Sequence, residues 1–548
     1  MLSATRYFMS DPSLQPHAIP PAATVPVSPW SPFQVRIFRH LWLANLVSMI
    51  GTWMNDVGAG WLMATLTDSP VMVAMIQTVG YLPSVFLALP AGALADIFDR
   101  RRYLILVNFW MVLVAGILGL LTVYGITNAW ILLLCIFGLG IGSAMGMPAF
   151  AAVAPEVVPR RVLHHAIALN TMGMNVSRAI GPALAGIIVA QAGSGAVFLL
   201  NAASFICVIY VYCRWQRVTM PSNLPAERFF SALKIGIRFC LNAPPLHAAL
   251  IRSIGFFVFA SALWALLPLI AKQLLQGGPK SFGILLGAIG IGAVIGALIL
   301  PALRNRYSSD TLIAWYSIQY ALAMAAIALV HNYSIAILAG AFCGMAWITV
   351  ISCTQVAAQM ALPNWVRSRG LAVMVMTMMG SMSMGSLLWG NVAEVTSIPA
   401  ALLIAALCTV LALPLTRRWP ISGNDQMDLT PSRHWRMPKV REEVSHNRSP
   451  AMMIIHYQVK PGNEQDFLLT IKSLGQVRRR DGAYAWDILE DAVEPNHYIE
   501  YYLVESWLEH LRQRERITNT DKLIQEHLRT LLQDGSAPVV THFVGPEN

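Results

Sequence analysis

The fold of this chain is constrained above all by a series of apolar runs, each long enough to cross a lipid bilayer. A membrane-spanning helix needs about 20 predominantly apolar residues, and polar or basic segments separate runs of about this length. Charged residues make up only 12% of the chain, against about a quarter in soluble domains. The runs cover about 41–66, 71–95, 103–124, 130–154, 166–190, 196–213, 248–271, 281–303, 311–331, 334–358, 370–394 and 399–415. We therefore predict an all-α polytopic membrane protein with twelve transmembrane helices.

A polar break in the middle divides these runs into two groups of six. Residues 228–241 within the break are amphipathic, which predicts a helix lying on the inner membrane surface. The stretch from Gly181 to Gly186 resembles that from Gly385 to Gly390, as two six-helix repeats should. The predicted domains are a disordered cytoplasmic arm at 1–32, an N-terminal six-helix bundle at 33–213, an inter-bundle loop at 214–247, a C-terminal six-helix bundle at 248–418, a linker at 419–450 and a cytoplasmic domain at 451–548.

The basic residues indicate how the chain is oriented in the membrane. Arginines gather in the N-terminal arm, in every second loop and after the last apolar run, whereas the opposite loops offer essentially Lys272 and Lys280. Because positive charge stays on the cytoplasmic side, we predict that both termini are cytoplasmic. The formal net charge of +10 follows from this bias, so we expect no nucleic acid as a partner.

The residues after 450 predict a small α+β domain. Their alternation and periodicity give the order strand, helix, strand, strand, two helices, strand, which is typical of a ferredoxin-like fold. One face of the predicted helix at 507–518 carries Trp507, His510, Gln513 and Arg516. Such a face could line a ligand pocket, although the pattern favours a dimer contact or a solvated surface. We find no flavin, haem or metal motif, and predict no cofactor, no metal site and no catalytic residue.

Two charges inside the apolar runs are candidates for function, because each costs several kcal/mol unless it is paired or hydrated. Asp56 lies about fifteen residues into the first run and Arg178 about twelve residues into the fifth. At about 1.5 Å per residue both lie roughly 18–24 Å above the inner surface, which allows an ion pair. Asp56 is either a proton-titrating acid that responds to Arg178 or half of a static ion pair. Asn55 and Asn175 either line a polar cavity or form interhelical hydrogen bonds.

A short basic turn joins the second and third runs and carries a recognisable motif. The stretch from Gly92 to Arg102 reads Gly-Ala-Leu-Ala-Asp-Ile-Phe-Asp-Arg-Arg-Arg. It resembles the loop signature of the major facilitator superfamily between transmembrane helices 2 and 3. The resemblance implies that Gly92, Asp96, Arg100 and Arg101 are gating-loop residues. Ile97 and Asp99 depart from the signature, which usually has a basic residue and a glycine there.

The fifth run contains a second family-like pattern, Gly181-Pro182 followed by Ala185-Gly186. It resembles the antiporter motif of superfamily exporters in helix 5. Proline removes a backbone hydrogen bond, and small residues allow close packing. We therefore expect Gly181, Pro182 and Gly186 to form a hinge or cavity wall, and the motif favours export over uptake. A simple proline kink with a small-residue interface is the alternative.

Taken together, residues 30–548 are similar to the transmembrane secretion effector, or enterobactin-exporter-like, branch of the major facilitator superfamily. The C-terminal domain looks like the dimeric α+β barrel of antibiotic-biosynthesis monooxygenases. The resemblance implies a secondary active transporter of the bacterial inner membrane that works by alternating access. It also implies proton-coupled export of small hydrophobic or siderophore-like molecules. The expected partners are the lipid bilayer, a small-molecule substrate, protons and a second copy bound through the C-terminal domain.

Two other classes of function remain open from the sequence. The helical bundle could be a ligand sensor that signals through the C-terminal domain. Alternatively, that domain could be a membrane-tethered enzyme acting on small molecules. We predict that the protein is a transporter and not an enzyme.

Overall fold

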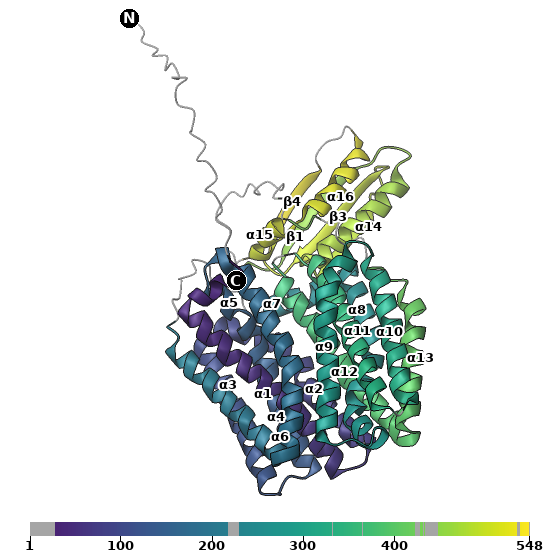
Figure 1. Ribbon diagram of the computed structural model, residues 1–548. Coiled ribbons are helices and arrows are strands. Elements are labelled where there is room, and N and C mark those ends of the chain that lie inside the picture. The colour runs from purple at the N-terminus through teal and green to yellow at the C-terminus, as the bar shows by residue number, and fades with distance from the viewer. Residues whose placement is uncertain are drawn as a thin grey trace, which may run out of the picture.

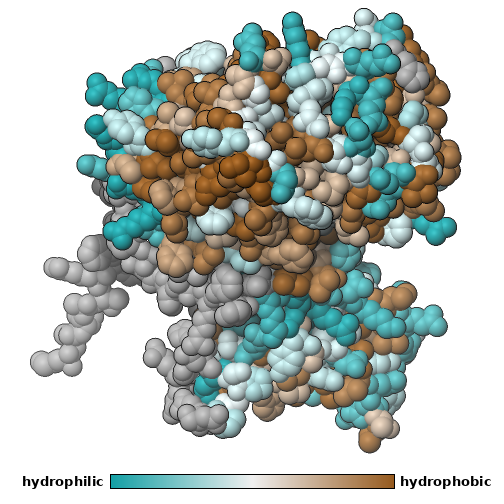
Figure 2. All heavy atoms as spheres, turned by 90° about the horizontal axis from the view of Figure 1, so that it is seen from below, coloured by the Kyte–Doolittle hydropathy of each residue, from teal (hydrophilic) through white to brown (hydrophobic). Residues whose placement is uncertain are grey.

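A body of long helices carries a small α/β domain at one end (Figure 1). The computed structural model describes residues 28–216, 229–330, 332–363, 365–421, 428–430, 432, 448–533 and 538–546. Most of the predicted arm and linker therefore lies outside the described residues. We call the end of the helical body next to the small domain the domain end, and the opposite end the far end. On the face shown in Figure 2, the helical body carries extensive apolar surface interspersed with polar residues.

The first half of the helical body consists of eight helical elements, of which five are long. They are η1 (Ser31–Gln34), α1 (Arg36–Leu66), α2 (Pro70–Ile97), α3 (Arg100–Val123), α4 (Ala129–Ala151), α5 (Val153–Val157), η2 (Arg160–Val162) and α6 (Leu163–Arg214). Side chains cap several of them at the N-terminus, as short polar residues do. Asp99 accepts a hydrogen bond from the Arg102 backbone N–H at 2.9 Å. Asp99, which replaces the glycine of the family signature, is therefore the N-cap residue of α3.

Helix α6 joins two predicted spans without a loop. Its 52 residues turn at Gly193, whose φ of 77° and ψ of 170° are not helical. A positive φ suits glycine because it has no Cβ. The chain therefore reverses direction at the far end within a single residue.

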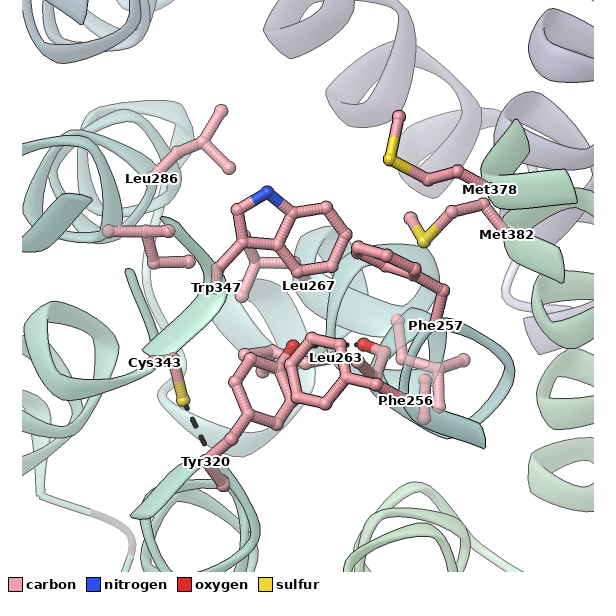
Figure 3. Packing of buried hydrophobic residues seen from close by; sticks show 14 of the residues in the cluster. Phe256, Phe257, Leu263, Leu267, Leu286, Tyr320, Cys343, Trp347, Met378 and Met382 are labelled. Carbon is pink, nitrogen blue, oxygen red and sulfur yellow. Dashed lines mark hydrogen bonds between the residues drawn. The ribbon is translucent and has the colours of Figure 1, made fainter. Parts of the chain in front are cut away.

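The second half begins with an amphipathic helix, α7 (Phe229–Leu241), at the domain end. Seven further elements follow: α8 (Pro244–Leu269), the π-helical turn η3 (Ile270–Leu274), α9 (Pro279–Arg304), α10 (Ser309–Leu329), α11 (Tyr333–Met360), α12 (Arg367–Val395) and α13 (Ile398–Thr416). Aromatic side chains fill its core: Phe256 and Phe257 of α8 pack against Tyr320 of α10 and Trp347 of α11 (Figure 3).

Ten helices among the described residues are long and apolar enough to cross a membrane. Counting the two arms of α6 separately and adding α1, which has 31 residues, brings these ten to twelve. The predicted polytopic helical fold is thus confirmed. The difference in number arises because the two helices that meet at Gly193 count as one element and because α1 is not among the ten.

The C-terminal domain has a four-stranded antiparallel sheet in the order β2-β3-β1-β4. Its elements are β1 (Ala451–Gln458), α14 (Glu464–Arg480), β2 (Ala485–Glu490), β3 (His497–Val504), α15 (Trp507–Arg516), α16 (Asn519–Thr530) and β4 (Val539–Val544). Alternate residues of β1 and β3, such as Met453 and Tyr502, are buried against Phe467 of α14 and Leu528 of α16. The strand order and the helices on one face agree with the predicted ferredoxin-like fold.

Candidate functional site

Two pairs of helices join the halves of the helical body. Helix α2 packs against α12, and the first arm of α6 packs against α9. Between α2 and α12, Thr78 Oγ1 donates to the Ser383 carbonyl at 3.1 Å, and Ser383 Oγ donates to the Thr78 carbonyl at 2.9 Å. Both residues are buried, so this reciprocal pair satisfies polar groups within the contact between the halves.

The contact between α6 and α9 is built from small residues, including those of the antiporter-like pattern. A Cβ placed on Gly186 would lie 2.9 Å from the Pro279 carbonyl, and one on Gly283 would lie 2.5 Å from the Pro182 carbonyl. A Cβ on Gly181 would lie 2.7 Å from Cβ of Trp53 in α1. These glycines are needed because the backbones approach too closely for any side chain. Gly186 and Pro182 therefore contact the opposite half, whereas Gly181 contacts its own half.

Two polar contacts close the far end between the halves. Lys272 Nζ donates to the Ala64 carbonyl at 2.5 Å and to the Asp68 carboxylate at 2.9 Å. Glu394 of α12 accepts from Ser69 Oγ at 2.7 Å and from the Val71 backbone N–H at 3.3 Å. We call these two contacts the far-end latch. Sequence analysis noted Lys272 only as a residue of the outer loops and assigned no role to Glu394, because their partners are distant in the chain.

Asp56 and Arg178 do not form the ion pair that their similar depth in the bilayer allowed. Among the described ion pairs there is none between them. Arg178 lies over the ring of Trp53, with 5.5 Å between the guanidinium carbon and the ring centroid. Its Nε and Nη1 atoms are buried and have no described acceptor. Tyr81 of α2 lies near enough to interact electrostatically with both charged groups.

Asp56 is exposed although most of its neighbours in α1 are buried. Thr52, one turn away on the same face, is exposed as well. Gly51 and Gly58, which pack against the second arm of α6, lie on the opposite side of the helix. Asp56 is therefore exposed on the face of α1 that points away from the second arm of α6. Asn55 is buried and its Oδ1 has no described donor, while Asn175 is half-buried.

The motif stretch at the domain end binds α3 to its own half. Arg100 forms an ion pair with Glu156 of α5 and donates to the Ala152 carbonyl at 3.5 Å. Arg101 donates to the carbonyls of Tyr212 and Cys213 at 2.9 and 2.7 Å, which are groups at the C-terminal end of α6. Gly92 and Asp96 lie in the last turns of α2; the side chain of Asp96 is outside those described.

The second half has an ion pair at the same end that sequence analysis missed. Arg252 of α8, only 4% exposed, donates to Asp310 of α10 at 2.9 Å and to the Trp419 carbonyl at 3.2 Å. Asp310 also accepts the Ile421 backbone N–H at 3.1 Å. The loop before α10 lacks the acid of the first-half motif, but Asp310 supplies one in the first turn of the helix.

The C-terminal domain is attached to the helical body through α7 and the loop before α12. Arg238 of α7 donates to the Gly482 carbonyl at 2.8 Å, and Lys234 forms an ion pair with Glu505 at 2.5 Å. The guanidinium of Arg516 lies 4.4 Å from the ring centroid of Trp365. These contacts place the domain against the second half.

The predicted helix face at 507–518 is not a solvated surface. Trp507, His510, Gln513 and Arg516 are all buried. Arg516 pairs with Glu509 and donates to the Asp481 carbonyl at 3.3 Å. The rings of Trp507 and His510 contact His542 of β4. Of the alternatives left open for this face, the solvated surface is wrong, because a helix pattern does not reveal that the sheet and the helical body cover α15.

Two other features lie away from the contact between the halves. Asp491, Glu494 and His497 could each offer one ligand atom to a metal ion, but they lie in a turn where Asp491 already accepts hydrogen bonds from Val493 and His497. A groove of about 510 Å³ lies between α10 and α11 and is almost entirely apolar. Its lining includes Leu322 and Leu338, which are exposed on the outside of the helical body, so the groove faces lipid.

Comparisons with known proteins agree with this architecture. Residues 27–548 match the family described as transmembrane secretion effector. A staphyloferrin A transporter of Staphylococcus aureus is 25% identical over 376 residues, which cover 68% of this chain and 93% of that protein. An enterobactin exporter of Salmonella typhimurium is 26% identical over 317 residues, or 58% and 75% of the two chains. The crystal structure of a bacterial homologue of the human lysosomal transporter Spinster, in an inward-facing and unoccupied conformation, has a TM-score of 0.56 at 13% identity, covering 72% of this chain and 97% of that one.

Proposed function

Because this chain belongs to the transmembrane secretion effector family of the major facilitator superfamily, we propose that it exports small hydrophobic or siderophore-like molecules in exchange for protons. Curated relatives support the substrate range, since they include transporters named for staphyloferrin A and enterobactin, a macrolide efflux protein and a multidrug efflux pump. The chain is a transporter and not an enzyme.

The observation that carries the proposal is the way the halves meet. The described polar contacts between them, including the far-end latch and the pair of Thr78 with Ser383, lie at the far end and towards the middle. The motif arginines at the domain end bind groups of their own half. With both termini cytoplasmic, this is an inward-facing state. Transport then requires the far-end contacts to open while contacts form at the domain end.

We assign the coupling role to Asp56. Its carboxyl is exposed in the middle of α1, and an ionisable group at this depth is a candidate proton carrier. No described ion pair holds it, so protonation does not have to break one. Arg178, Asn55 and Asn175 supply further polar groups at similar depth, while Pro182 and Gly186 sit where α6 meets the moving half.

The C-terminal domain supports a homodimer. The sheet face away from the helices carries exposed apolar side chains, among them Leu489 and Phe543, and Ile499 of β3 and Ile454 of β1 lie on the same face. A second copy of the same face is a complementary partner in a two-fold dimer. We place the protein in the bacterial inner membrane with this domain in the cytoplasm.

The proposal is tested by substrate flux in proteoliposomes under an imposed pH gradient. Hydrophobic drugs and siderophores are screened with the wild type, with Asp56→Asn and with Asp466→Asn. Asp466 is an exposed acid of the C-terminal domain and serves as the matched control. We expect gradient-driven flux in the wild type and the control, and flux that no longer follows the gradient in Asp56→Asn. Gradient-driven flux that persists in Asp56→Asn removes Asp56 from coupling, and flux that ignores the gradient in every variant removes proton exchange.

A further inference from the structure

We infer that Arg178 binds an anionic group of the substrate, a carboxylate or similar oxyanion carried on an apolar, aromatic-sized body. The inference rests on the proposed function and adds a substrate class to it. It starts from Arg178, which lies at a depth similar to that of Asp56 but forms no ion pair with any carboxylate of the described residues.

The environment of Arg178 demands an anion. An arginine inside a membrane protein is costly unless it is paired or hydrated, and two of its nitrogen atoms are buried without a described acceptor. Two buried arginines among the described residues have a carboxylate partner: Arg252 pairs with Asp310, and Arg478 pairs with Glu500. The contrast sets Arg178 apart from the arginines that hold the fold together.

The contact with Trp53 does not supply the hydrogen-bond acceptor that two nitrogen atoms of Arg178 lack. A guanidinium carbon over an aromatic ring makes a cation–π contact, whereas the N–H groups of the guanidinium match the two oxygen atoms of a carboxylate. Trp53 therefore orients the guanidinium without neutralising it. Together with Tyr81 of α2, it adds aromatic surface for the apolar part of a ligand.

Arg178 also lies where the two halves touch. A Cβ on Gly290 of α9 would be 2.7 Å from the Arg178 carbonyl, so this turn of α6 packs directly on the opposite half. A ligand held by the guanidinium is bound beside the contact that must rearrange during transport. Binding at this place can bias the equilibrium between the two states, because the ligand interacts differently with each.

The test uses the full chain in detergent, so that it does not depend on flux. Binding of 1-naphthoate, 1-naphthamide and 1-naphthylmethylamine is measured by equilibrium dialysis. These probes share one apolar body and differ in charge. We expect the wild type to prefer the anion over the neutral amide by about tenfold or more, the size of a charge-assisted hydrogen bond.

The variants are Arg178→Gln, Arg178→Lys and, as a matched control, Arg36→Gln. Arg36 is an exposed arginine at the start of α1. The preference should vanish in Arg178→Gln, persist in reduced form in Arg178→Lys and stay unchanged in the control. Equal binding of naphthamide by all variants shows that the site is intact. If Arg178→Gln is unfolded, the Lys variant decides, since retained charge without the bidentate geometry must weaken the preference.

The outcomes separate this inference from the proposed function. A wild type without preference for the anion, or a preference that survives in Arg178→Gln, overturns the inference even if proton-driven export is found. Conversely, an anion preference that depends on Arg178 supports the inference even if flux ignores the pH gradient.

Discussion

At the scale of single residues, polar side chains in this molecule act through partners that lie far away in the chain. Glu394 illustrates this, because it caps the N-terminus of α2 from the opposite half. A carboxylate near a helix N-terminus is favoured by the unpaired N–H groups and by the helix dipole. The same contact fixes the far end in its closed arrangement.

Removing the charge of Glu394 should therefore loosen the far end. We expect Glu394→Gln to raise the ratio of far-end-open to far-end-closed molecules about two- to fivefold, the usual size of a helix-terminal charge effect. The ratio is measured from spin-label distances between Ile126 and Val395, both exposed at the far end, in a background without the native cysteines. Glu526→Gln in the C-terminal domain is the control. An unchanged distance distribution in Glu394→Gln contradicts the latch.

His542 gives a residue-scale prediction for pH. Burial lowers its pKa below 6.5, so the unfolded chain binds a proton more tightly than the folded domain. The contribution of neutral His542 to the stability of the domain is therefore fully present above a pH of about 6.5 and is lost as the pH falls below that value. Hydrogen exchange of residues 538–546, corrected for intrinsic rates, should accelerate between pH 7.5 and 5.5.

Two histidine variants check this assignment. His542→Gln should flatten the pH dependence of exchange, whereas His527→Gln, an exposed histidine of α16, should retain it. A pH dependence that survives in His542→Gln assigns the effect to another group.

At the scale of elements, the decisive contacts are between helix backbones. The glycines of α9 allow α6 to approach so closely that the chain has no room for a methyl group. Close packing of this kind is what holds membrane helices together, since lipid offers no hydrophobic driving force between them.

A single methyl group should thus separate α6 from α9. Gly283→Ala places a Cβ 2.5 Å from the Pro182 carbonyl and 2.9 Å from the Gly186 Cα, and backbone atoms cannot rotate away. We expect a cost of about 1–3 kcal/mol to far-end closure, measured with the same spin labels. Gly116→Ala in α3 should have no such effect, because no described atom beyond the nearby backbone of α3 itself lies within 4 Å of the added carbon. Equal effects of both substitutions contradict the prediction.

The sequence could predict the spans and strands but not how they face one another. Apolar length defines a span, and alternation defines strands such as β1 and β3, because both are local patterns. Counting residues along each apolar run placed Asp56 and Arg178 at a similar depth in the bilayer. An ion pair also depends on the direction in which each side chain leaves its helix, which the count does not show. The turn at Gly193 was not predicted, because it depends on the backbone angles of one residue and not on a pattern in the neighbouring sequence. The burial of Arg516 against Trp365 depends on residues about 150 positions apart.

At the scale of the whole molecule, the small domain and the helical body form one connected structure. Arg238, Lys234 and Trp365 hold the domain against the second half. Trp365 also packs edge-on against Phe239 of α7, with 5.4 Å between ring centroids. One aromatic side chain thus links the loop before α12, α7 and the domain.

Loss of that side chain should release the domain. We expect Trp365→Ala to speed hydrogen exchange of α7 and of residues 478–484 about two- to thirtyfold, the range of a cation–π contact. Trp130→Ala, which removes an exposed tryptophan of α4, is the control. Unchanged exchange in Trp365→Ala means that Arg238 and Lys234 alone hold the domain.

The attachment of the domain to one half has a practical consequence. As the halves rock against each other, the domain must travel with α7 and α12, so its separation from the turn at α5 reports the angle between the halves. The domain therefore moves as a rigid attachment of the second half relative to the first half. A donor dye on α16 and an acceptor beside α5 convert each transport cycle of a single molecule into a change of energy-transfer efficiency, without a label in the membrane.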